Sequence, residues 1–310
     1  MQSLGRFVVS PPFCSVDAKH VGICSCRSPA LDDLTMLSSL LYVPITNDRF
    51  LASAARSDPD VIILDLEDSI PASDKEAARL RLSTVVPMLV KSGKRTFVRV
   101  NHCAQLLEAD TRAAATAGAN GLVIPKVEDP AVLADAARFI ELAAKAGSTM
   151  PVIPLIESPR GILNADAIAA YPQVMGMICG SEDLATSMNA RPSREFLRVP
   201  KMLVHLAAKA NRKLSFGLLQ TIANYKDLDQ LAQSIDEAKK FGFDGTTCIH
   251  PSALPLINKA FRIGVQEKER AQRLIKAADA NAARGVGAFL FEGDFIDEAM
   301  IKRARWLLNP

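Results

Sequence analysis

The sequence lacks the long, one-sided runs that mark membrane proteins and nucleic-acid-binding proteins. Charged residues or prolines interrupt each apolar stretch before it reaches the roughly 18 residues of a membrane span. The 37 basic and 34 acidic residues give a net charge of +3, without a long run of either sign. Charge therefore indicates neither a nucleic-acid partner nor a membrane surface. With 49% hydrophobic and 23% charged residues, we expect a soluble globular protein.

Several short functional motifs are also missing. The chain has no GxGxxG after a strand-like run, and no GxxxxGK(S/T), GxSxG or HExxH. The dinucleotide-binding, P-loop, α/β-hydrolase and zincin classes therefore have no support. The CxC of Cys24 and Cys26 has no further His or Cys at zinc spacing, so it predicts no metal site. Cys103, Cys179 and Cys248 lie in or beside apolar runs, which favours buried, reduced thiols and a reducing compartment such as the cytoplasm.

The first 35 residues show no sustained periodicity and contain the pair Pro11-Pro12. They predict either a poorly ordered extension or sequence upstream of a start near Met36. A targeting peptide is a third reading, which the acidic residues Asp17, Asp32 and Asp33 disfavour. We leave residues 1–35 out of the fold prediction.

From residue 39 onward, short apolar runs alternate with helical patterns. There are eight runs: LLYVP (40–44), VIILDLED (61–68), TFVRVN (96–101), GLVIPKV (121–127), PVIPLIE (151–157), MGMICGSED (175–183), KLSFGLLQ (213–220) and TTCIHP (246–251). Most are continuously apolar, as parallel strands covered on both faces are. The pattern predicts an α/β fold, a (β/α)8 TIM barrel over residues 36–262.

The chain continues for about sixty residues after the eighth run. The range 257–283 is charge-laced and helical in pattern, and more apolar positions follow it. A minimal barrel does not need this segment. We expect residues 263–310 to form a C-terminal helical lid over the barrel mouth of the same or a neighbouring subunit.

Two of the apolar runs stop at acidic residues. VIPLI (152–156) ends at Glu157, and the run MGMIC (175–179) leads to Asp183. A βαβ unit places such residues side by side at the carboxyl ends of neighbouring strands, where α/β proteins carry their chemistry. Two hard oxygen ligands predict a binding site for a magnesium ion (Mg2+). The alternative is a pair of solvated turn carboxylates.

Other runs end in charged residues with two readings each. Asp65, Glu67 and Asp68 repel one another unless cations balance them, or else they are helix-capping acids in a turn. Arg99 lies within an apolar strand, which is costly unless it points into a polar mouth or pairs with Asp65 or Glu67.

The remaining strand ends carry weaker candidates. Lys126 allows Schiff-base chemistry, but neighbouring carboxylates would raise its pKa and disfavour it. His250 next to Pro251 is either structural or catalytic. Gly180 and Ser181 permit close backbone approach, whereas Glu182 alternates away from Asp183. We predict Gly180, Ser181 and Glu182 as substrate-binding residues.

Together these stretches resemble the citrate lyase beta subunit-like family, which includes malyl-CoA and citramalyl-CoA lyases and is related to metal-dependent 2-oxo-acid aldolases. The resemblance runs from about Leu40 to Ala304. It is carried by seven motifs in order: VIILDLEDSIP, FVRVN, GLVIPKVE, PLIESPRGILNA, CGSEDLA, FGFDGTTCIHP and GAFLFEGDFIDEAMIKRA.

The resemblance implies a magnesium ion held by Glu157 and Asp183, with Arg99 contacting the oxygen of a bound 2-oxo acid. It implies that Glu67 and Asp68 act through metal-bound waters. Asp297 matches an acidic residue in the family's C-terminal lid, which crosses a subunit interface in a homo-oligomer. The implied function is a magnesium-dependent carbon–carbon lyase that cleaves a 3-hydroxy acyl-CoA of citramalyl, malyl or citryl type.

The chain departs from the family where coenzyme A binding is expected. Ser38, Ile45 and Ser53 replace an Arg, a Gly and a Lys, and Arg49 and Arg56 are the candidate substitutes. Coenzyme A binding therefore stays open. Two alternatives follow: an aldolase that acts on a free hydroxy-oxo acid, and a non-catalytic or regulatory barrel.

Overall fold

The barrel strands occur in the predicted places. The computed structural model describes residues 37–143, 150–223 and 225–308. Its barrel strands are β1 Ser39–Pro44, β2 Val61–Asp65, β3 Thr96–Arg99, β4 Gly121–Ile124, β5 Val152–Ile156, β6 Gly176–Cys179, β7 Leu214–Phe216 and β8 Thr246–Cys248. They are parallel and lie in the order β7-β6-β5-β4-β3-β2-β1-β8. The predicted TIM barrel is confirmed.

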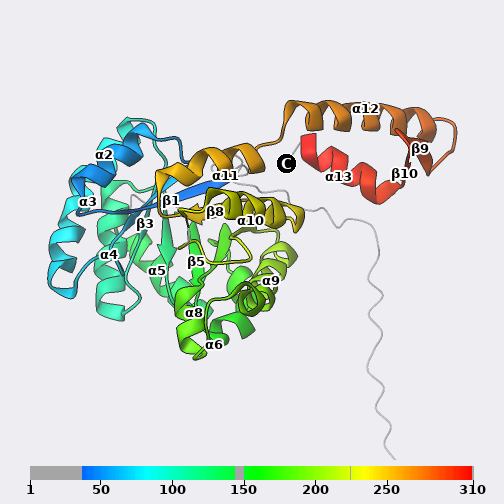
Figure 1. Ribbon diagram of the computed structural model, residues 1–310. Coiled ribbons are helices and arrows are strands. Elements are labelled where there is room, and N and C mark those ends of the chain that lie inside the picture. The colour runs from blue at the N-terminus through cyan, green and yellow to red at the C-terminus, as the bar shows by residue number, and fades with distance from the viewer. Residues whose placement is uncertain (1–36, 144–149, 224, 309–310) are drawn as a thin grey trace, which may run out of the picture. The chain divides into compact units, whose positions relative to one another are not determined.

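Helices connect the strands and surround them (Figure 1). They are α2 Asp48–Arg56, α3 Lys75–Lys91, α4 Ala104–Ala117, α5 Pro130–Ala143, α6 Pro159–Leu163, α7 Ala165–Ala169, α8 Glu182–Ser187, α9 Arg194–Ala210, α10 Leu228–Lys240 and α11 Leu254–Phe261, with 3-10 turns η1 Ala72–Asp74 and η2 Pro251–Ala253. No helix in the described ranges combines the length and apolarity of a membrane span. The expectations for residues 1–35 and their cysteines lie outside the described residues.

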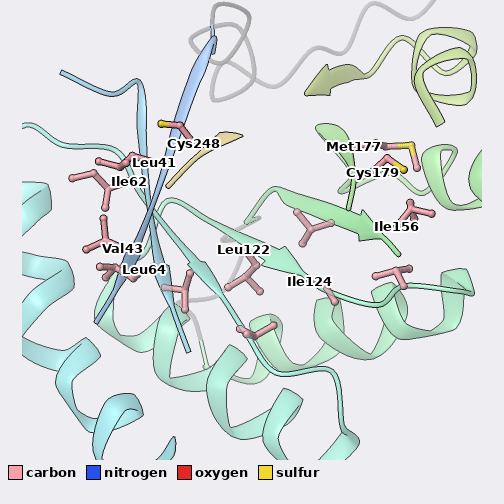
Figure 2. Packing of buried hydrophobic residues seen from close by; sticks show 14 of the residues in the cluster. Leu41, Val43, Ile62, Leu64, Leu122, Ile124, Ile156, Met177, Cys179 and Cys248 are labelled. Carbon is pink, nitrogen blue, oxygen red and sulfur yellow. The ribbon is translucent and has the colours of Figure 1, made fainter. Parts of the chain in front are cut away.

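Each barrel strand is buried on both faces, which explains the continuous apolar runs. Leu41 and Val43 of β1 lie in register with Ile62 and Leu64 of β2. These four belong to a layer that also contains helix residues (Figure 2). Because successive side chains on a strand point to opposite faces, the residues between them face the barrel interior. This alternation directs Asp65, at the end of β2, inward.

The cysteine prediction is confirmed in two of three positions. Cys179 and Cys248 are free and buried, whereas Cys103 is free but exposed. Cys103 falls beyond the end of β3, at the N-cap of α4, so its neighbouring apolar run does not cover it. Proximity to a strand was therefore an insufficient guide to burial.

The segment after α11 contains a hairpin as well as helices. It comprises α12 Val265–Ala282, the antiparallel strands β9 Phe289–Phe291 and β10 Asp294–Ile296, and α13 Glu298–Leu308. Glu292 and Gly293 both have positive φ, 52° and 90°, as a two-residue type I′ turn requires. The helical stretch expected over 257–283 is confirmed by α11 and α12, with a break at residues 262–264 between them.

This C-terminal segment has an apolar core of its own. Its buried side chains come from α12, β10 and α13: Ala271, Leu274, Ala278, Ile296, Ile301 and Ala304. Arg270 reinforces the hairpin by ion pairs with Glu292 and Asp294, each at 2.9 Å. The segment thus packs as a unit around α12 and α13. Its expected role as a lid stays a prediction.

The barrel closes unevenly. β1 pairs with β8 over three residues, but β7 and β8 share a single bridge, Phe216 to Gly245, within the described chain. A Cβ atom at Gly245 would lie 2.2 Å from the carbonyl oxygen of Ser38. No real Cβ contact is that short, so closure of β8 onto β1 requires glycine at position 245.

We expect Gly245→Ala to lower the free energy of unfolding by about 3 kcal/mol, because the added methyl group meets backbone rather than a mobile side chain. Chemical denaturation measures this change. Gly287→Ala is the matched control, since its Cβ would have no atom within 4 Å. Equal stability of the two variants would contradict the close packing of Gly245 against the Ser38 backbone.

Candidate active site

A cavity of about 620 Å³ lies at the carboxyl ends of the strands. Most of the predicted site residues line it: Asp68, Arg99, Glu157, Gly180, Ser181, Glu182 and Asp183. Glu67 joins them through ion pairs with Arg99 and Lys126. In the described chain, no residue of 263–308 lines this cavity, so Asp297 is apart from it. The fold therefore gathers predicted residues from the ends of four strands, β2, β3, β5 and β6, in one place.

The ion pair between Asp65 and Arg99 follows from strand register. Asp65 of β2 and Arg99 of β3 are paired Cα positions, so their side chains lie on the same face. Arg99 Nε and Nη2 donate to Asp65 Oδ1 and Oδ2 at 2.7 and 2.8 Å. Burial alone would raise the pKa of Asp65, but the Arg99 guanidinium holds it below its ordinary value. Of the two readings of Arg99, the ion pair is observed, and it leaves Arg99 at the cavity wall.

Arg99 also touches two further acids and an aromatic ring. Its Nη1 lies 2.9 Å from Glu67 Oε2 and 3.6 Å from Asp68 Oδ2. Its guanidinium carbon lies 4.9 Å from the centre of the Tyr42 ring. Burial raises the pKa of the Tyr42 hydroxyl above its ordinary value, so that hydroxyl stays protonated. Tyr42 was not predicted as a site residue, although alternation along β1 directs it inward.

Glu157 follows β5 directly and is only 8% exposed. Its Oε2 accepts a hydrogen bond of 3.1 Å from the backbone N–H of Lys126. Burial, and then the negative charge of Asp183, raise the pKa of Glu157 to about 8. A Cβ at Gly180 would lie 2.6 Å from Glu157 Cγ, so the missing side chain at position 180 makes room for this carboxyl group.

Asp183 reaches the site differently from the expectation. The strand β6 ends at Cys179, and Asp183 lies in the first turn of α8 rather than at a strand end. Its side chain is 39% exposed, and its Oδ2 is 3.5 Å from Lys126 Nζ. Beside it, Glu182 accepts a hydrogen bond of 2.6 Å from the Thr221 hydroxyl. The buried carboxylate and the accessible one thus come from consecutive barrel units.

Lys126 connects the acidic residues. Its ammonium lies 2.8 Å from Glu67 Oε1 and 3.6 Å from Asp68 Oδ1, as well as near Asp183. Burial alone would lower its pKa, but the hydrogen bond to Glu67 raises it above the ordinary lysine value. A Schiff base needs the opposite shift, so the reading disfavoured on sequence is disfavoured by the structure as well.

A lysine of the cavity wall, Lys201, was missed. It is 3% exposed and donates to the carbonyl oxygens of Leu218 and Gln220 at 2.8 and 2.9 Å. Burial lowers its pKa to about 8. Helical spacing carried a signal, because Lys201 falls on the same face of α9 as the buried Leu197 and Val204.

His250 also lines the cavity. Its Nδ1 accepts a hydrogen bond from the Ser252 backbone N–H at 3.2 Å, and its ring stacks on Tyr225 at 5.0 Å between centroids. These contacts hold the ring at the start of η2. These contacts agree with a structural role for His250, and none of them requires a catalytic role.

The three departures from the family pattern have different surroundings. Ser38 and Ile45 are 6% and 0% exposed, and neither is among the described residues that line the cavity. The backbone N–H of Ser38 donates to Asp60 at 2.8 Å. Ser53 does line the cavity, as does Arg49, which forms no ion pair with any described residue. Only Ser53 of the three therefore bears directly on cavity chemistry.

Asp297 has a local structural partner. Its Oδ1 accepts hydrogen bonds from the backbone N–H groups of Ala299 and Met300 at 3.0 and 3.1 Å, at the start of α13. A short acidic side chain in that place satisfies N–H groups that the helix leaves open. The structure thus gives Asp297 a helix-capping role, and its catalytic role stays a prediction.

Carboxylates and an arginine converging at the carboxyl ends of eight parallel strands define an enzyme built on a TIM barrel. The chain belongs to the HpcH/HpaI aldolase/citrate lyase family, whose pattern matches residues 38–251. The resemblance drawn from the seven motifs is confirmed. Membership in a family of enzymes also removes support from the non-catalytic alternative.

Individual relatives cover most of the chain. A citrate lyase subunit beta-like protein of Deinococcus radiodurans is 30% identical over 280 residues, 88% of this chain and 97% of the relative. A (3S)-malyl-CoA thioesterase of Cereibacter sphaeroides is 32% identical over 274 residues, 87% and 93% of the two chains. The structure of CitE from Mycobacterium tuberculosis in complex with magnesium, acetoacetate and coenzyme A matches with a TM-score of 0.71 and 30% identity, over 88% of this chain and 97% of that one.

We expect Asp65→Asn to lower the free energy of unfolding by about 3–5 kcal/mol at neutral pH, because it leaves Arg99 buried without its bidentate partner. A carboxyl group with a lowered native pKa stabilises the fold above its unfolded pKa of about 4 and loses that effect as pH falls through the native value. The difference from wild type should therefore shrink in acid.

Denaturant unfolding between pH 3 and 8 measures both effects. Asp135→Asn is the control, since Asp135 pairs with Arg138 at 3.5 Å on the exposed surface and should change stability little. A constant difference between Asp65→Asn and wild type across this range would contradict the assignment.

Proposed function

We propose that this protein is a magnesium-dependent carbon–carbon lyase that cleaves a 3-hydroxy acyl-CoA thioester to a 2-oxo acid and an acyl-CoA. The observation that carries the proposal is the pairing of the buried Glu157 with the accessible Asp183 on the wall of a cavity that also contains Arg99. Citramalyl-, malyl- and citryl-CoA are the candidate substrates.

The residues of the site fit a magnesium ion. Glu157 is a buried carboxylate that accepts a hydrogen bond at Oε2 from the backbone N–H of Lys126. Burial, and then the nearby charge of Asp183, raise its pKa. Both groups offer hard oxygen atoms, as this ion prefers. Glu67 Oε2 is also buried and, among described groups, accepts no well-aligned hydrogen bond. We propose Glu157 and Asp183 as the metal ligands, with Glu67 and Asp68 holding metal-bound waters.

A bound magnesium ion would supply Lewis-acid polarisation of the substrate oxygen at this site. Arg99 adds a fixed positive charge. Asp65 takes up two of its five N–H groups, and Glu67 Oε2 lies 2.9 Å from Nη1. We propose that the N–H bonds left over on Nη1 and Nη2 bind a substrate oxygen. We propose that Arg99 stabilises the negative charge that develops on the hydroxyl oxygen as the carbon–carbon bond breaks.

The neighbouring backbone and the C-terminal segment have supporting roles in this proposal. Gly180 and Ser181 bring backbone close to the substrate, and Glu182 is held in place by Thr221. Asp297 would act from the lid of a neighbouring subunit in a homo-oligomer. This last role is supported by the resemblance of the GDFIDEAMIKRA segment to the family's lid.

Binding of the coenzyme A part of the substrate is supported by the relatives and by residues that line the cavity. The relative from Cereibacter sphaeroides is a (3S)-malyl-CoA thioesterase, and the CitE structure contains coenzyme A. In this chain, Arg49 pairs with no acid of the described residues and brings a positive charge to the cavity, where Ser53 provides none. We propose Arg49 as the group that binds a phosphate of coenzyme A in this chain.

We expect purified protein to release a 2-oxo acid from one of the three thioesters when magnesium is present. Glu157→Ala and Asp183→Ala should each lower kcat by about a hundredfold or more. Each variant removes one of the two carboxylates that we propose hold the magnesium ion in place. Coupled reduction of the 2-oxo acid measures the rate. Absence of cleavage, with Glu157→Ala indistinguishable from wild type, would refute the proposal.

The second candidate is an aldolase that acts on a free hydroxy-oxo acid, and Ser53 at the cavity wall is the observation in its favour. Calorimetry with coenzyme A separates the two. The thioester lyase predicts binding that weakens about tenfold in Arg49→Ala, the loss of one charge-assisted contact. The exposed Arg138 on α5 supplies the control variant, Arg138→Ala. Absence of binding to wild type would favour the aldolase, and submicromolar binding would exclude it.

A further inference from the structure

Lys126 is more than a neighbour of the metal site. We propose that its ammonium is a tethered counter-ion of the acidic cluster, defined as Glu67, Asp68, Glu157 and Asp183. In this role Lys126 limits the affinity of the site for a divalent cation and keeps the site receptive to an anionic 2-oxo acid. This inference rests on the proposed function, because it assumes that the cluster holds magnesium.

The contacts of Lys126 reach every member of the acidic cluster. Its ammonium lies 2.8 Å from Glu67, 3.6 Å from Asp68 and 3.5 Å from Asp183. Its backbone N–H donates to Glu157 at 3.1 Å. One residue therefore contacts both proposed metal ligands, one through the backbone and the other through the side chain. Such a residue affects the site by charge as well as by position.

The backbone of Lys126 separates these two contributions. Its φ of 55° lies in the left-handed region, which glycine and asparagine adopt more readily than lysine does. A glycine at this position would adopt the same conformation and retain the N–H that Glu157 accepts. The lysine side chain is therefore not needed for the bend. Its ammonium can be removed without removing the backbone contact.

The charges of the site give the ammonium a defined effect. Asp65 balances the charge of Arg99, whose Nη1 also reaches Glu67 and Asp68. Lys126 is the cation whose side chain contacts three members of the cluster, Asp183 among them. Four carboxylates exceed one ammonium and one divalent ion by a single negative charge. Without Lys126 the excess doubles. A cation would then bind more tightly, and a carboxylate substrate would be repelled more strongly.

Removal of the ammonium should thus change two affinities in opposite directions. A residue that only supports the fold would weaken both, because a displaced Glu157 or Asp183 serves neither ligand. The opposite signs distinguish a counter-ion from a scaffold. Both affinities are measured by binding alone, without catalytic turnover.

The experiment uses the full chain and calorimetry. Metal-free Lys126→Gly is titrated with magnesium chloride, and the magnesium-saturated protein is titrated with pyruvate. Relative to wild type, we expect magnesium to bind about tenfold more tightly and pyruvate about tenfold more weakly, the scale of one partly exposed charge at this range. Lys126→Arg retains the charge and should stay within about threefold of wild type for both ligands.

Lys209→Met controls for the loss of one positive charge elsewhere. Lys209 pairs with Asp244 at 2.6 Å, and neither residue lines the cavity. We expect both affinities to be unchanged in this variant. Thermal unfolding of each protein verifies that it is folded.

The outcomes separate this inference from the function on which it rests. If wild type binds no magnesium, the proposed function and the role of Lys126 both fail. If wild type binds magnesium and Lys126→Gly binds it equally or less tightly, the counter-ion role alone is overturned. Unchanged pyruvate affinity with tighter magnesium binding overturns the claim about anionic substrate.

Discussion

The site depends on one buried interaction, the ion pair between Asp65 and Arg99. An arginine inside a barrel is costly unless an acid neutralises it, and parallel register supplies that acid from the adjacent strand. Once held by Asp65, the guanidinium presents its remaining side to Tyr42, Glu67 and the cavity. Asp65 also accepts hydrogen bonds from the backbone N–H groups of Glu67 and Ser69, so the residue that holds Arg99 also orders the turn after β2.

Much of the fold and part of the site were readable in the sequence. Continuous apolar runs identified all eight strands, and Glu157 follows directly from the end of one. Asp183 was placed in the right region but on the wrong element, because apolar periodicity does not show where a strand stops and a short helix starts. Lys126 was weighed only as a nucleophile, since its ion pairs join strand ends far apart in the chain. The β9–β10 hairpin was missed because Glu-Gly is a weaker turn signal than Asn-Gly.

The departures from the family pattern show why position must be known before a substitution is interpreted. Ser38 and Ile45 looked informative about coenzyme A in sequence, yet both are packed into the barrel wall, and Ser38 is tied to Asp60. The sequence does not show this packing, because the residues that contact Ser38 and Ile45 are distant from them in the chain. Arg49 and Ser53, on the same face of a short helix, are the positions where the cavity itself differs.

The junction between β7 and β8 has a consequence for motion. The described junction has one bridge, Phe216 to Gly245, and two backbone hydrogen bonds, from the Gly217 N–H to Gly245 and from the Asp244 N–H to Ser215. Few hydrogen bonds have to break for β7 and β8 to separate locally, and such a segment opens at a low free-energy cost. The chain after β7, from Gly217 to Ala223, also lines the cavity. Local opening at this junction would therefore move part of the cavity wall.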